Sequence, residues 1–375
     1  MTSEWHEVPL RELVGYISKG IAPSYAEEAS ETTIRVLNQK CNRNFRISYG
    51  DSRLHDTLKK KVPPERYVKP DDILINSTGA GTAGRIAQIE DVPSATTIDG
   101  HMILIRSNRK VTQKFLGYAL KAHQWEVLQL DEGSTGQTEL NRDRLLDEIM
   151  INYPVSFDEQ NAIVGTLESI DRKLIVNEQL NDNLQQQAQA IYSSMFIDNP
   201  DPAWSHGHLS DLITVKYGKD HKKLADGIYP VYGSGGIMRY VERPLYNKES
   251  VLIPRKGTLN NVMYVNQPFW SVDTMFYTEM KLPNVAKFVY HFVKAKDLAS
   301  MNAGSAVPSM TTDILNAMEV VIPSASALEE FESLVAPMYE AMEANDVQSK
   351  ALSQIRDTLL PKLMSGEIDV SDVQL

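Results

Sequence analysis

Two stretches of the chain share a spacing of apolar residues that predicts long helices. The segments 156–203 and 326–375 contain few Gly and Pro residues, and apolar residues recur in them in alternating steps of four and three. This spacing keeps one stripe of side chains facing a partner helix and is typical of a coiled coil. The predicted seam consists of Ile163, Leu167, Ile170, Leu174, Asn177, Leu184 and Ile191 in the first helix, and Phe331, Val335, Met338, Met342, Asn345, Leu352, Leu359 and Leu363 in the second.

The two seams become polar at the same place, with Asn177 in the first matching Asn345 in the second. A polar seam residue costs stability but disfavours other registers and partners. The matched positions favour antiparallel pairing of the two helices, which would place the preceding domains at opposite ends of a rod. Two unrelated amphipathic helices, each packed on its own domain, are the alternative. Ser156 with Glu159 and Ser326 with Glu329 each fit a capping box at a helix start.

The segments before the two helices have a different pattern. Short β-branched or aromatic runs, punctuated by Gly and Pro, predict strands in a compact α+β arrangement. These runs are Asp72–Asn76, Met102–Arg106, Ser250–Pro254 and Val262–Val265. The predicted fold class is therefore α+β, with two pseudo-symmetric α+β domains separated by a pair of long antiparallel coiled-coil helices.

Matching residues in the two halves indicate an internal duplication. Trp5, Leu10 and Leu13 recur as Trp204, Leu209 and Leu212, and the order of later matches is the same in both halves. An ordered series of this kind is the signature of a repeat. The predicted organisation is a first domain at 1–155, a first helix and linker at 156–203, a second domain at 204–325, and a second helix and C-terminal tail at 326–375.

Composition limits the class of protein. The 375 residues include one cysteine, Cys41, so an intramolecular disulfide and a Cys-rich metal site are excluded. No signal peptide and no apolar run of membrane-spanning length is visible, so we expect a cytoplasmic protein without membrane contact. The net charge of −11 and a pI near 5.3 argue at first sight against a nucleic-acid partner.

The distribution of charge reverses that first impression. The two helical segments together carry −13, whereas 1–155 and 204–325 together carry +2. Within these two domains the basic residues cluster near aromatic residues, a pattern that suits contact with DNA phosphates, although a charge run is also common on a solvated face. The predicted DNA-binding cations are Lys40, Arg43, Arg46, Arg53, Lys59, Lys60, Lys61 and Arg85 in the first domain, and Lys216, Lys219, Lys222, Lys223, Arg239, Arg255 and Lys256 in the second.

Motifs for catalysis are weak. Asp273 with Glu279 and Lys281 resembles the acidic-acidic-lysine set that binds Mg²⁺ in many nucleases, but the spacing is short and the first half has no equivalent. The glycine-rich run Gly79–Gly84 is followed by a segment too short for the helix of a dinucleotide-binding site, so we expect a tight turn. No metal site and no catalytic residue is predicted.

The chain resembles the specificity subunit of type I restriction-modification systems. The matching segments are Val231–Ile237, Leu252–Gly257, Phe269–Trp270 and Ser271–Thr274, the loops Gly133–Gln137 and Gly304–Ser309, and the helix end Leu359–Ile368. The resemblance covers nearly the whole chain. It departs from the family pattern at Glu329–Glu330, where a Glu-Gln pair is expected, and at Arg239, where glycine is common.

The resemblance implies a non-catalytic DNA-binding protein of a prokaryotic phage-defence system. Each α+β domain would be a target-recognition domain that reads half of a bipartite double-stranded DNA target, and the helices would set the gap between the halves. The helices would also hold two methyltransferase subunits, which bind S-adenosylmethionine for DNA methylation, and the complex would recruit restriction subunits that use ATP and Mg²⁺. Loops containing Gln137, Thr138 and Ser309 are expected to read bases.

Two alternatives remain open at this stage. One is a Mg²⁺-dependent DNA nuclease built on Asp273, Glu279 and Lys281. The other is a coiled-coil adaptor that binds only protein, which the duplicated domains and their basic clusters disfavour.

Overall fold

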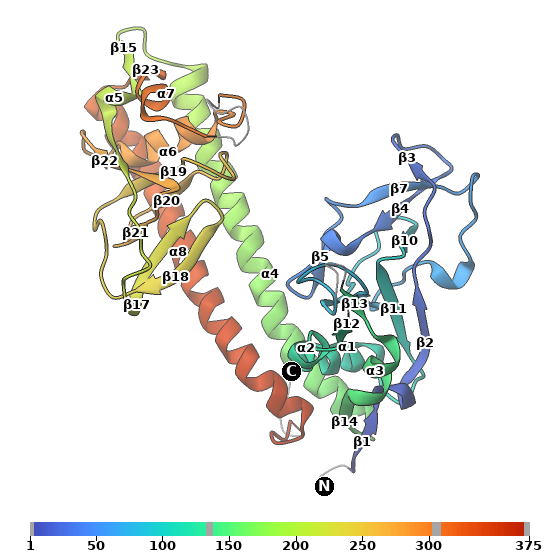
Figure 1. Cartoon of the computed structure of the whole chain (residues 1–375). Coiled ribbons are helices and arrows are strands. Elements are labelled where there is room, and N and C mark those ends of the chain that lie inside the picture. Colours follow the sequence, from blue (N-terminus) through green and yellow to red (C-terminus); the bar gives the residue numbers. More distant parts are fainter. Residues whose placement is uncertain (1–3, 133–137, 302–308, 371–375) are drawn as a thin grey trace. The chain divides into compact units, whose positions relative to one another are not determined.

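The structure is a computed structural model that describes residues 4–132, 138–301 and 309–370 (Figure 1). The chain forms two compact units. The first contains residues up to Val176 and those from Gln348 onward, and the second runs from Asn177 to Val347. Each unit therefore contains one mixed α+β domain and one part of each long helix. The predicted division at 155, 203 and 325 follows a different criterion, the type of element, and stays a prediction.

The first unit is built on two four-stranded sheets. The central strands of one sheet, β8 and β11, are almost wholly apolar and buried. The order is β2-β11-β8-β9 in that antiparallel sheet and β10-β4-β7-β3 in the other, where β10 and β4 are parallel. The strand bounds are β2 Val14–Lys19, β3 Tyr25–Ala26, β4 Thr33–Leu37, β7 Arg53–Asp56, β8 Ile73–Asn76, β9 Ile86–Gln88, β10 Thr96–Ile98 and β11 Met102–Ser107.

The second unit repeats this plan with shorter connections. Its antiparallel sheet has the order β16-β22-β19-β20, and a three-stranded sheet has the order β18-β17-β21, with β17 and β21 parallel. The bounds are β16 Ile213–Tyr217, β17 Asp226–Gly233, β18 Gly236–Val241, β19 Ser250–Pro254, β20 Met263–Val265, β21 Trp270–Ser271 and β22 Met275–Met280. The common strand order confirms that the two halves are pseudo-symmetric.

One glycine in each unit occupies an equivalent tight junction after the first strand of the antiparallel sheet. A Cβ on Gly20 would lie 2.2 Å from the carbonyl oxygens of Ile98 and Asp99, and one on Gly218 would lie 2.0 Å from that of Val272. Both approaches are too close for any other residue. The duplication therefore extends to backbone contacts, beyond the apolar pattern.

Shorter elements complete the units. Antiparallel two-stranded ribbons β1–β14 and β15–β23 lie at corresponding places, next to the start of each long helix. The bounds are β1 Trp5–Pro9, β5 Asn42–Arg43, β6 Arg46–Ile47, β12 Asp131–Glu132, β13 Glu139–Leu140, β14 Met150–Pro154, β15 Ser205–His208 and β23 Glu319–Ile322, with helices α1 Gln113–Ala122, α2 Gln124–Val127, α3 Arg142–Glu148, α5 Leu209–Leu212, α6 Ala286–Lys294 and α7 Thr312–Asn316.

The long helices are α4, Phe157–Ser193, and α8, Ala325–Met364. They pack together antiparallel in each unit, as predicted: in the first, Arg356 of α8 donates to Asp171 of α4 at 3.1 Å, and in the second, Phe331 packs with Tyr192. All residues of the predicted seam are buried or half-buried. Neither helix, nor any other helix in the described residues, has a stretch apolar enough to cross a membrane.

The polar positions of the seam form a hydrogen-bonded layer in the second unit. Asn345 donates to the side-chain oxygen of Asn181 at 2.8 Å, and Asn181 donates to Asp346 at 2.8 Å. The side chain of Asn177, which is buried, donates to the Asn345 carbonyl at 3.4 Å. Because these bonds form only in one register, the layer fixes the alignment of the two helices.

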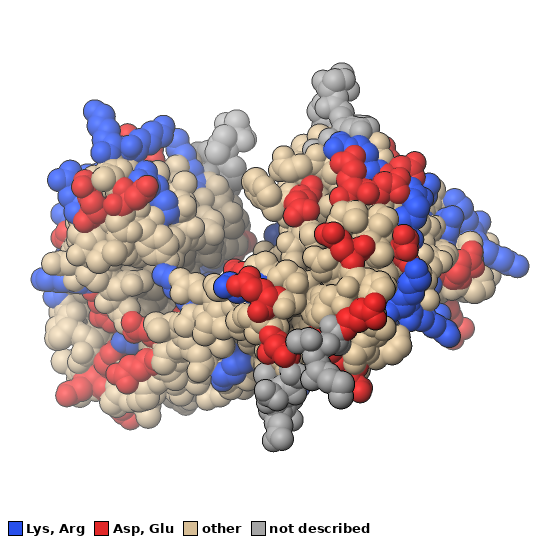
Figure 2. All heavy atoms as spheres, turned by 90° about the horizontal axis from the view of Figure 1, so that it is seen from below, with Lys and Arg blue, Asp and Glu red and all other residues tan. Residues whose placement is uncertain are grey.

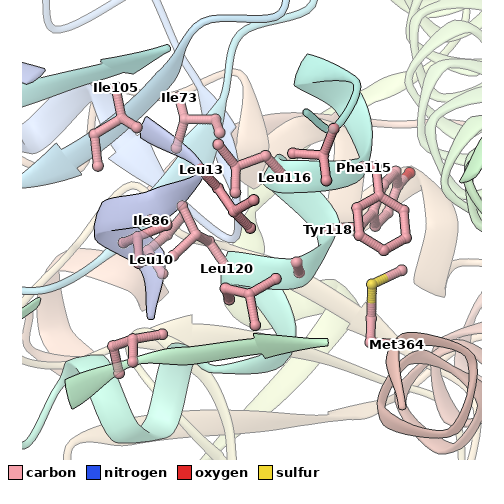
Figure 3. Packing of buried hydrophobic residues seen from close by; sticks show 14 of the residues in the cluster. Leu10, Leu13, Ile73, Ile86, Ile105, Phe115, Leu116, Tyr118, Leu120 and Met364 are labelled. Atoms are coloured by element: carbon pink, nitrogen blue, oxygen red, sulfur yellow. The ribbon is translucent and has the colours of Figure 1, made fainter. Parts of the chain in front are cut away.

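Each core is completed by a helix end that comes from far along the chain. In the first unit, Leu360, Leu363 and Met364 of α8 pack with residues of the N-terminal domain, including Phe115 and Tyr118 of α1 (Figure 3). In the second, Ala188 and Tyr192 at the end of α4, and Phe196 just after it, join the core around α6. The two halves of the sequence therefore contribute to both cores.

The helix ends differ in detail from the prediction. The first helix begins as expected, with Ser156 accepting a bond from the Glu159 amide at 3.4 Å, but the Glu159 carboxylate accepts from the Trp5 indole instead of completing the capping box. The second helix begins earlier than Ser326, because Ser324 provides the cap by accepting from the Ala327 amide. It ends at Met364, and the nearby Gly366, whose φ is 75°, suits a left-handed helix stop.

Candidate nucleic-acid interface

A basic groove in the first unit lies where two loops meet. The connection between β4 and β7 forms the small β5–β6 ribbon, and the glycine-rich turn follows β8. They enclose a groove of about 700 Å³. It is lined by Gln39, Lys40, Arg43, Asn44, Gly79, Ala80, Thr82 and Arg85, and none of these described lining residues is acidic.

Buried asparagines hold the two loops together. The side chain of Asn42 donates to the Arg85 carbonyl at 2.8 Å, and that of Asn76 donates to the Gln39 carbonyl at 3.2 Å. Both asparagines are almost fully buried. Thr138 lies beside the glycine-rich turn, because its hydroxyl donates to the Gly79 carbonyl at 3.1 Å. The groove is thus a fixed feature of the fold, with three cationic side chains around it.

The glycine-rich turn is a tight turn, as the sequence predicted. Gly79, Gly81 and Gly84 all have positive φ, at 121°, 67° and 83°. The amides of Thr82 and Ala83 both donate to the Gly79 carbonyl, and the strand β9 follows directly. No helix starts here, so the turn lacks the N-terminal amides that bind a dinucleotide pyrophosphate.

The other predicted cations of the first domain lie outside this groove. Arg46 lines a separate cleft, and Arg53 stacks on the Tyr25 ring with its guanidinium carbon 3.3 Å from the ring centre. Lys59 lies 3.9 Å from the Asp56 carboxylate, whereas Lys60 donates to the Ala22 carbonyl at 2.8 Å. Lys61 is exposed. The predicted basic residues of the first domain are therefore divided between the groove, the cleft lined by Arg46, and the segment from Arg53 to Lys61.

In the second unit the cations gather beside the end of β19. Arg255 lies 5.4 Å from the centre of the Tyr217 ring and donates to the Asp273 carbonyl at 3.2 Å. Lys256 is exposed and forms a β-bridge with Ser309. Lys219, Lys222 and Lys223 are exposed on the loop between β16 and β17. We call these residues the basic edge of the second unit, and the groove with Lys40, Arg43 and Arg85 the basic edge of the first.

Two predicted cations of this domain are paired within the protein. Lys216 lies 3.6 Å from Glu279, and Arg239 donates to Asp226 at 2.7 Å and to the Leu224 carbonyl at 3.0 Å. Arg239 therefore ties the β17–β18 hairpin to the preceding loop.

The two basic edges occupy equivalent places but use different residues. The segment Ser77–Gly79 in the first unit corresponds to Arg255–Gly257 in the second. The backbone carbonyl of Ser77 accepts from the Leu140 amide, and that of Arg255 accepts from the Met310 amide. The next residue in each unit forms a β-bridge, Thr78 with Glu139 and Lys256 with Ser309. Charge is thus at the strand end in one unit and on neighbouring loops in the other. Figure 2 shows Lys and Arg side chains gathered into patches within each unit.

Sequence reasoning missed some lining residues and included one that lies outside the described structure. Gln39 and Thr82 line the groove, and the signal that could have found them is their adjacency to Lys40 and to the glycine-rich turn. Gln137 lies outside the described residues. The roles assigned to the individual cations, to Thr138 and to Ser309 remain predictions.

The residues of the nuclease alternative do not converge. Lys281 donates to the Ser210 carbonyl at 2.6 Å, and Glu279 lies beside Lys216, so neither is directed at a shared ion with Asp273. No group of three His, Cys, Asp or Glu residues that could hold a metal occurs in the described parts of the chain.

A half-buried charge network attaches the first domain to the helices. Asp171 of α4 accepts from Lys121 and Tyr118 of α1, each at 2.9 Å, and from Arg356 of α8 at 3.1 Å. Burial alone would raise the pKa of Asp171, but the Lys121 ammonium and the hydrogen bonds lower it below its usual value. The carboxylate is therefore charged and locks α1 against both helices.

The second unit has a neutral network at the corresponding place. The buried His291 of α6 donates from Nδ1 to Gln189 of α4 at 2.8 Å and accepts from the Tyr339 hydroxyl of α8 at 2.9 Å. Burial lowers the pKa of His291 to about 4. Both domains are thus bonded to both helices, with different chemistry.

Comparisons with known proteins agree with this architecture. The family model "Type I restriction modification DNA specificity domain" matches residues 2–186 and 203–331. The MjaIX type I restriction enzyme specificity subunit of Methanocaldococcus jannaschii is 24% identical over 372 residues, covering 87% of this chain and 84% of that protein. The HindI specificity subunit of Haemophilus influenzae is 34% identical over 92 residues, covering 24% and 18%.

A solved structure has the same fold. The crystal structure of the type I restriction-modification S subunit from M. genitalium superposes with a TM-score of 0.60 and 18% identity, covering 96% of each chain. The two matched regions of the family model include most of both units described above. With its duplicated α+β domains and paired helices, this chain belongs to the family of type I restriction-modification DNA specificity proteins.

Proposed function

We propose that this chain is the sequence-reading subunit of a type I restriction-modification complex and has no catalytic activity alone. Each unit reads one half of a bipartite double-stranded DNA target, and the paired helices set the distance between the halves. The observation that carries the proposal is the duplicated basic edge, formed at equivalent strand ends in two units that share the same pair of helices.

The chemistry of the edges suits DNA. The first groove offers Lys40, Arg43 and Arg85 without an acidic lining residue, so it can neutralise phosphates and offer donors to base edges. The acidic helices would repel DNA and are available to protein partners. We propose that they hold two methyltransferase subunits, which bind S-adenosylmethionine, and that restriction subunits with ATP and Mg²⁺ complete the complex. This chain holds no cofactor in the proposal, and the complex works in the cytoplasm of a prokaryote.

A salt titration tests the DNA-binding role of the groove. The chain, purified with its methyltransferase subunit, is compared with the variant Lys40→Ala/Arg43→Ala in binding to its target at several salt concentrations. Each lost phosphate contact should reduce the slope of log affinity against log salt by about 0.9. Lys110→Ala, which removes an exposed lysine beside Glu12, is the matched control. An unchanged slope would exclude these two residues from the interface.

The spacing role is tested by changing helix length. Adding one heptad to both α4 and α8 should preserve their pairing and lengthen the gap between the two halves of the methylation motif. Sequencing of methylated adenines in cells that express the two forms measures that gap. The same motif from both forms would refute the role of the helices as a spacer. Incubating the chain alone with Mg²⁺ and plasmid addresses the nuclease alternative, which requires cutting.

A further inference from the structure

The β17–β18 hairpin of the second unit exposes apolar side chains that its own fold does not use. Ile228 on β17 is 77% exposed, and Met238 and Ile237 on β18 are 60% and 49% exposed. Their neighbours Val231 and Val241 are fully buried in a core with Phe269, so the base of the hairpin is firmly packed. The hairpin therefore presents Ile237 and Met238 near its tip, and Ile228 near its other end, from a fixed support.

The tip of the hairpin is held beside the basic edge. The Asn261 side chain donates to the Ser234 carbonyl at 2.8 Å, and Gly257 lies so close that a Cβ there would be 2.6 Å from the Ser234 hydroxyl. Met238 lies across Gly233, where a Cβ would come within 2.6 Å of its sulfur atom. Gly257 and Gly233 thus allow the hairpin tip to lie close to both Lys256 and Met238.

Cations border this apolar surface on two sides. Lys256 follows β19 next to the tip, and Lys222 and Lys223 lie on the loop that Arg239 bonds to the hairpin through the Leu224 carbonyl. An apolar patch between cations complements a polyanion that also offers apolar groups. The major groove of DNA is such a surface: it admits a two-stranded β-ribbon, and the apolar group on its floor is the thymine methyl.

The first unit has different chemistry at the equivalent place. Its corresponding strand pair is β4–β7, and the long connection between Leu37 and Arg53 carries Lys40 and Arg43 into the groove instead of forming a tight apolar hairpin. The two units therefore present unlike surfaces to DNA from the same position in the fold. Unlike surfaces are expected to recognise unlike base edges.

We propose that the β17–β18 hairpin reads thymine methyl groups in its half of the target, with Met238 and Ile237 as specificity-determining contacts. This inference rests on the proposed DNA-reading function. It assigns apolar readout to the second unit alone, since the groove of the first unit offers hydrogen-bond donors.

The test replaces each thymine of the target by deoxyuridine, which lacks only the methyl group. The chain, purified with its methyltransferase subunit, is assayed by fluorescence anisotropy on the duplex carrying the methylation motif and on each substituted duplex. At one or more thymines of one half-site, the wild-type complex should bind deoxyuridine about fourfold more weakly per methyl removed. Replacing thymines of the other half-site by deoxyuridine should leave the affinity unchanged.

Variants assign the effect to the hairpin. Ile237→Ser/Met238→Ser should bind the thymine and deoxyuridine duplexes equally, whereas Leu282→Ser, an exposed apolar residue of the same unit, should retain the wild-type ratio. Lys40→Ala/Arg43→Ala should weaken binding to all duplexes and also retain the ratio. Circular dichroism of each variant checks that the fold is intact.

Three results would overturn the inference. In the first, replacing thymine by deoxyuridine changes the affinity at no position of the target. In the second, the variant Ile237→Ser/Met238→Ser still binds thymine more tightly than deoxyuridine by the wild-type factor. In the third, this variant loses only its binding to the methyltransferase subunit, which would identify a protein-docking surface. Failure of the complex to bind any specific DNA would instead refute the proposed function, so the two failures are distinguishable.

Discussion

The buried His291 predicts that the second unit loses stability as the pH falls below about 6.5. The neutral ring suits both of its hydrogen bonds: Nδ1 donates to the Gln189 side-chain oxygen, and Nε2 accepts from the Tyr339 hydroxyl, which a charged ring cannot do because both of its nitrogens carry a proton. Tyr192 stacks on the ring at 5.5 Å, and Phe331 meets it edge-on at 5.9 Å, so little solvent is available to a charged imidazole. Burial among these groups lowers the pKa of His291 from 6.5 to about 4.

The sign and size of the effect follow from proton linkage. In the unfolded chain the imidazole takes up a proton as the pH falls below 6.5, whereas in the folded unit it stays neutral down to about pH 4. The unfolded state therefore binds more protons in this interval, and the free energy of unfolding decreases. Over the whole interval the loss is about 3 kcal/mol. Below pH 4 this residue adds no further loss.

Hydrogen exchange of the α6 amides between pH 4 and 7 measures this loss. The variant His291→Asn keeps a side-chain donor but cannot titrate in this range, so it serves as the reference. The intrinsic exchange rate cancels in the ratio of wild-type to variant rates at each pH. That ratio should rise as the pH falls, by up to about 100-fold over the interval. A ratio that is independent of pH would refute the neutral, buried state of His291.

Three other predictions concern stability. Gly218→Ala places a Cβ 2.0 Å from a backbone carbonyl oxygen and should lower the thermal midpoint, whereas Gly235→Ala, with nothing within 4 Å, should not; equal midpoints would contradict the close approach. Asp171→Ala leaves two cations without their carboxylate and should cost about 3 kcal/mol in urea unfolding, against little for the exposed Asp143→Ala; similar costs would argue against the network. Phe331→Ala opens the second core and should cost about 3–5 kcal/mol, while amides of the first unit keep their exchange protection; loss of protection in both units would contradict separate cores.

Local pattern was sufficient for the elements with continuous or regularly spaced apolar residues. The run Ser250–Pro254 was predicted as a strand and is β19 with the same bounds, because continuous apolar residues between turn signals suit a strand covered on both faces. The seam positions of the two helices are buried or half-buried, because apolar residues in steps of four and three lie on one face of a helix. Helix starts were less predictable, because Ser324 and Ser326 both fit a cap and only the path of the incoming strand selects the first.

The candidate interface was predictable in outline but not in membership. Lys40 and Arg85 are far apart in sequence and share a groove because Asn42 and Asn76 bond across two loops. Conversely, Arg239 is basic and lies in the same domain as Lys256, but Asp226 and Leu224 bind its guanidinium. Pairing partners of this kind have no signature in a single sequence.

The sequence by itself determined the duplication, the α+β character of the repeated domains, the paired helices and the segregation of acidic charge to them, since each depends on the order and periodicity of residue types. Tertiary structure alone decided that the end of each helix closes a core begun elsewhere in the chain, and that the equivalent strand pairs β4–β7 and β17–β18 carry a cationic groove in one unit and an apolar hairpin in the other. These features depend on contacts between residues distant in sequence, which periodicity does not encode.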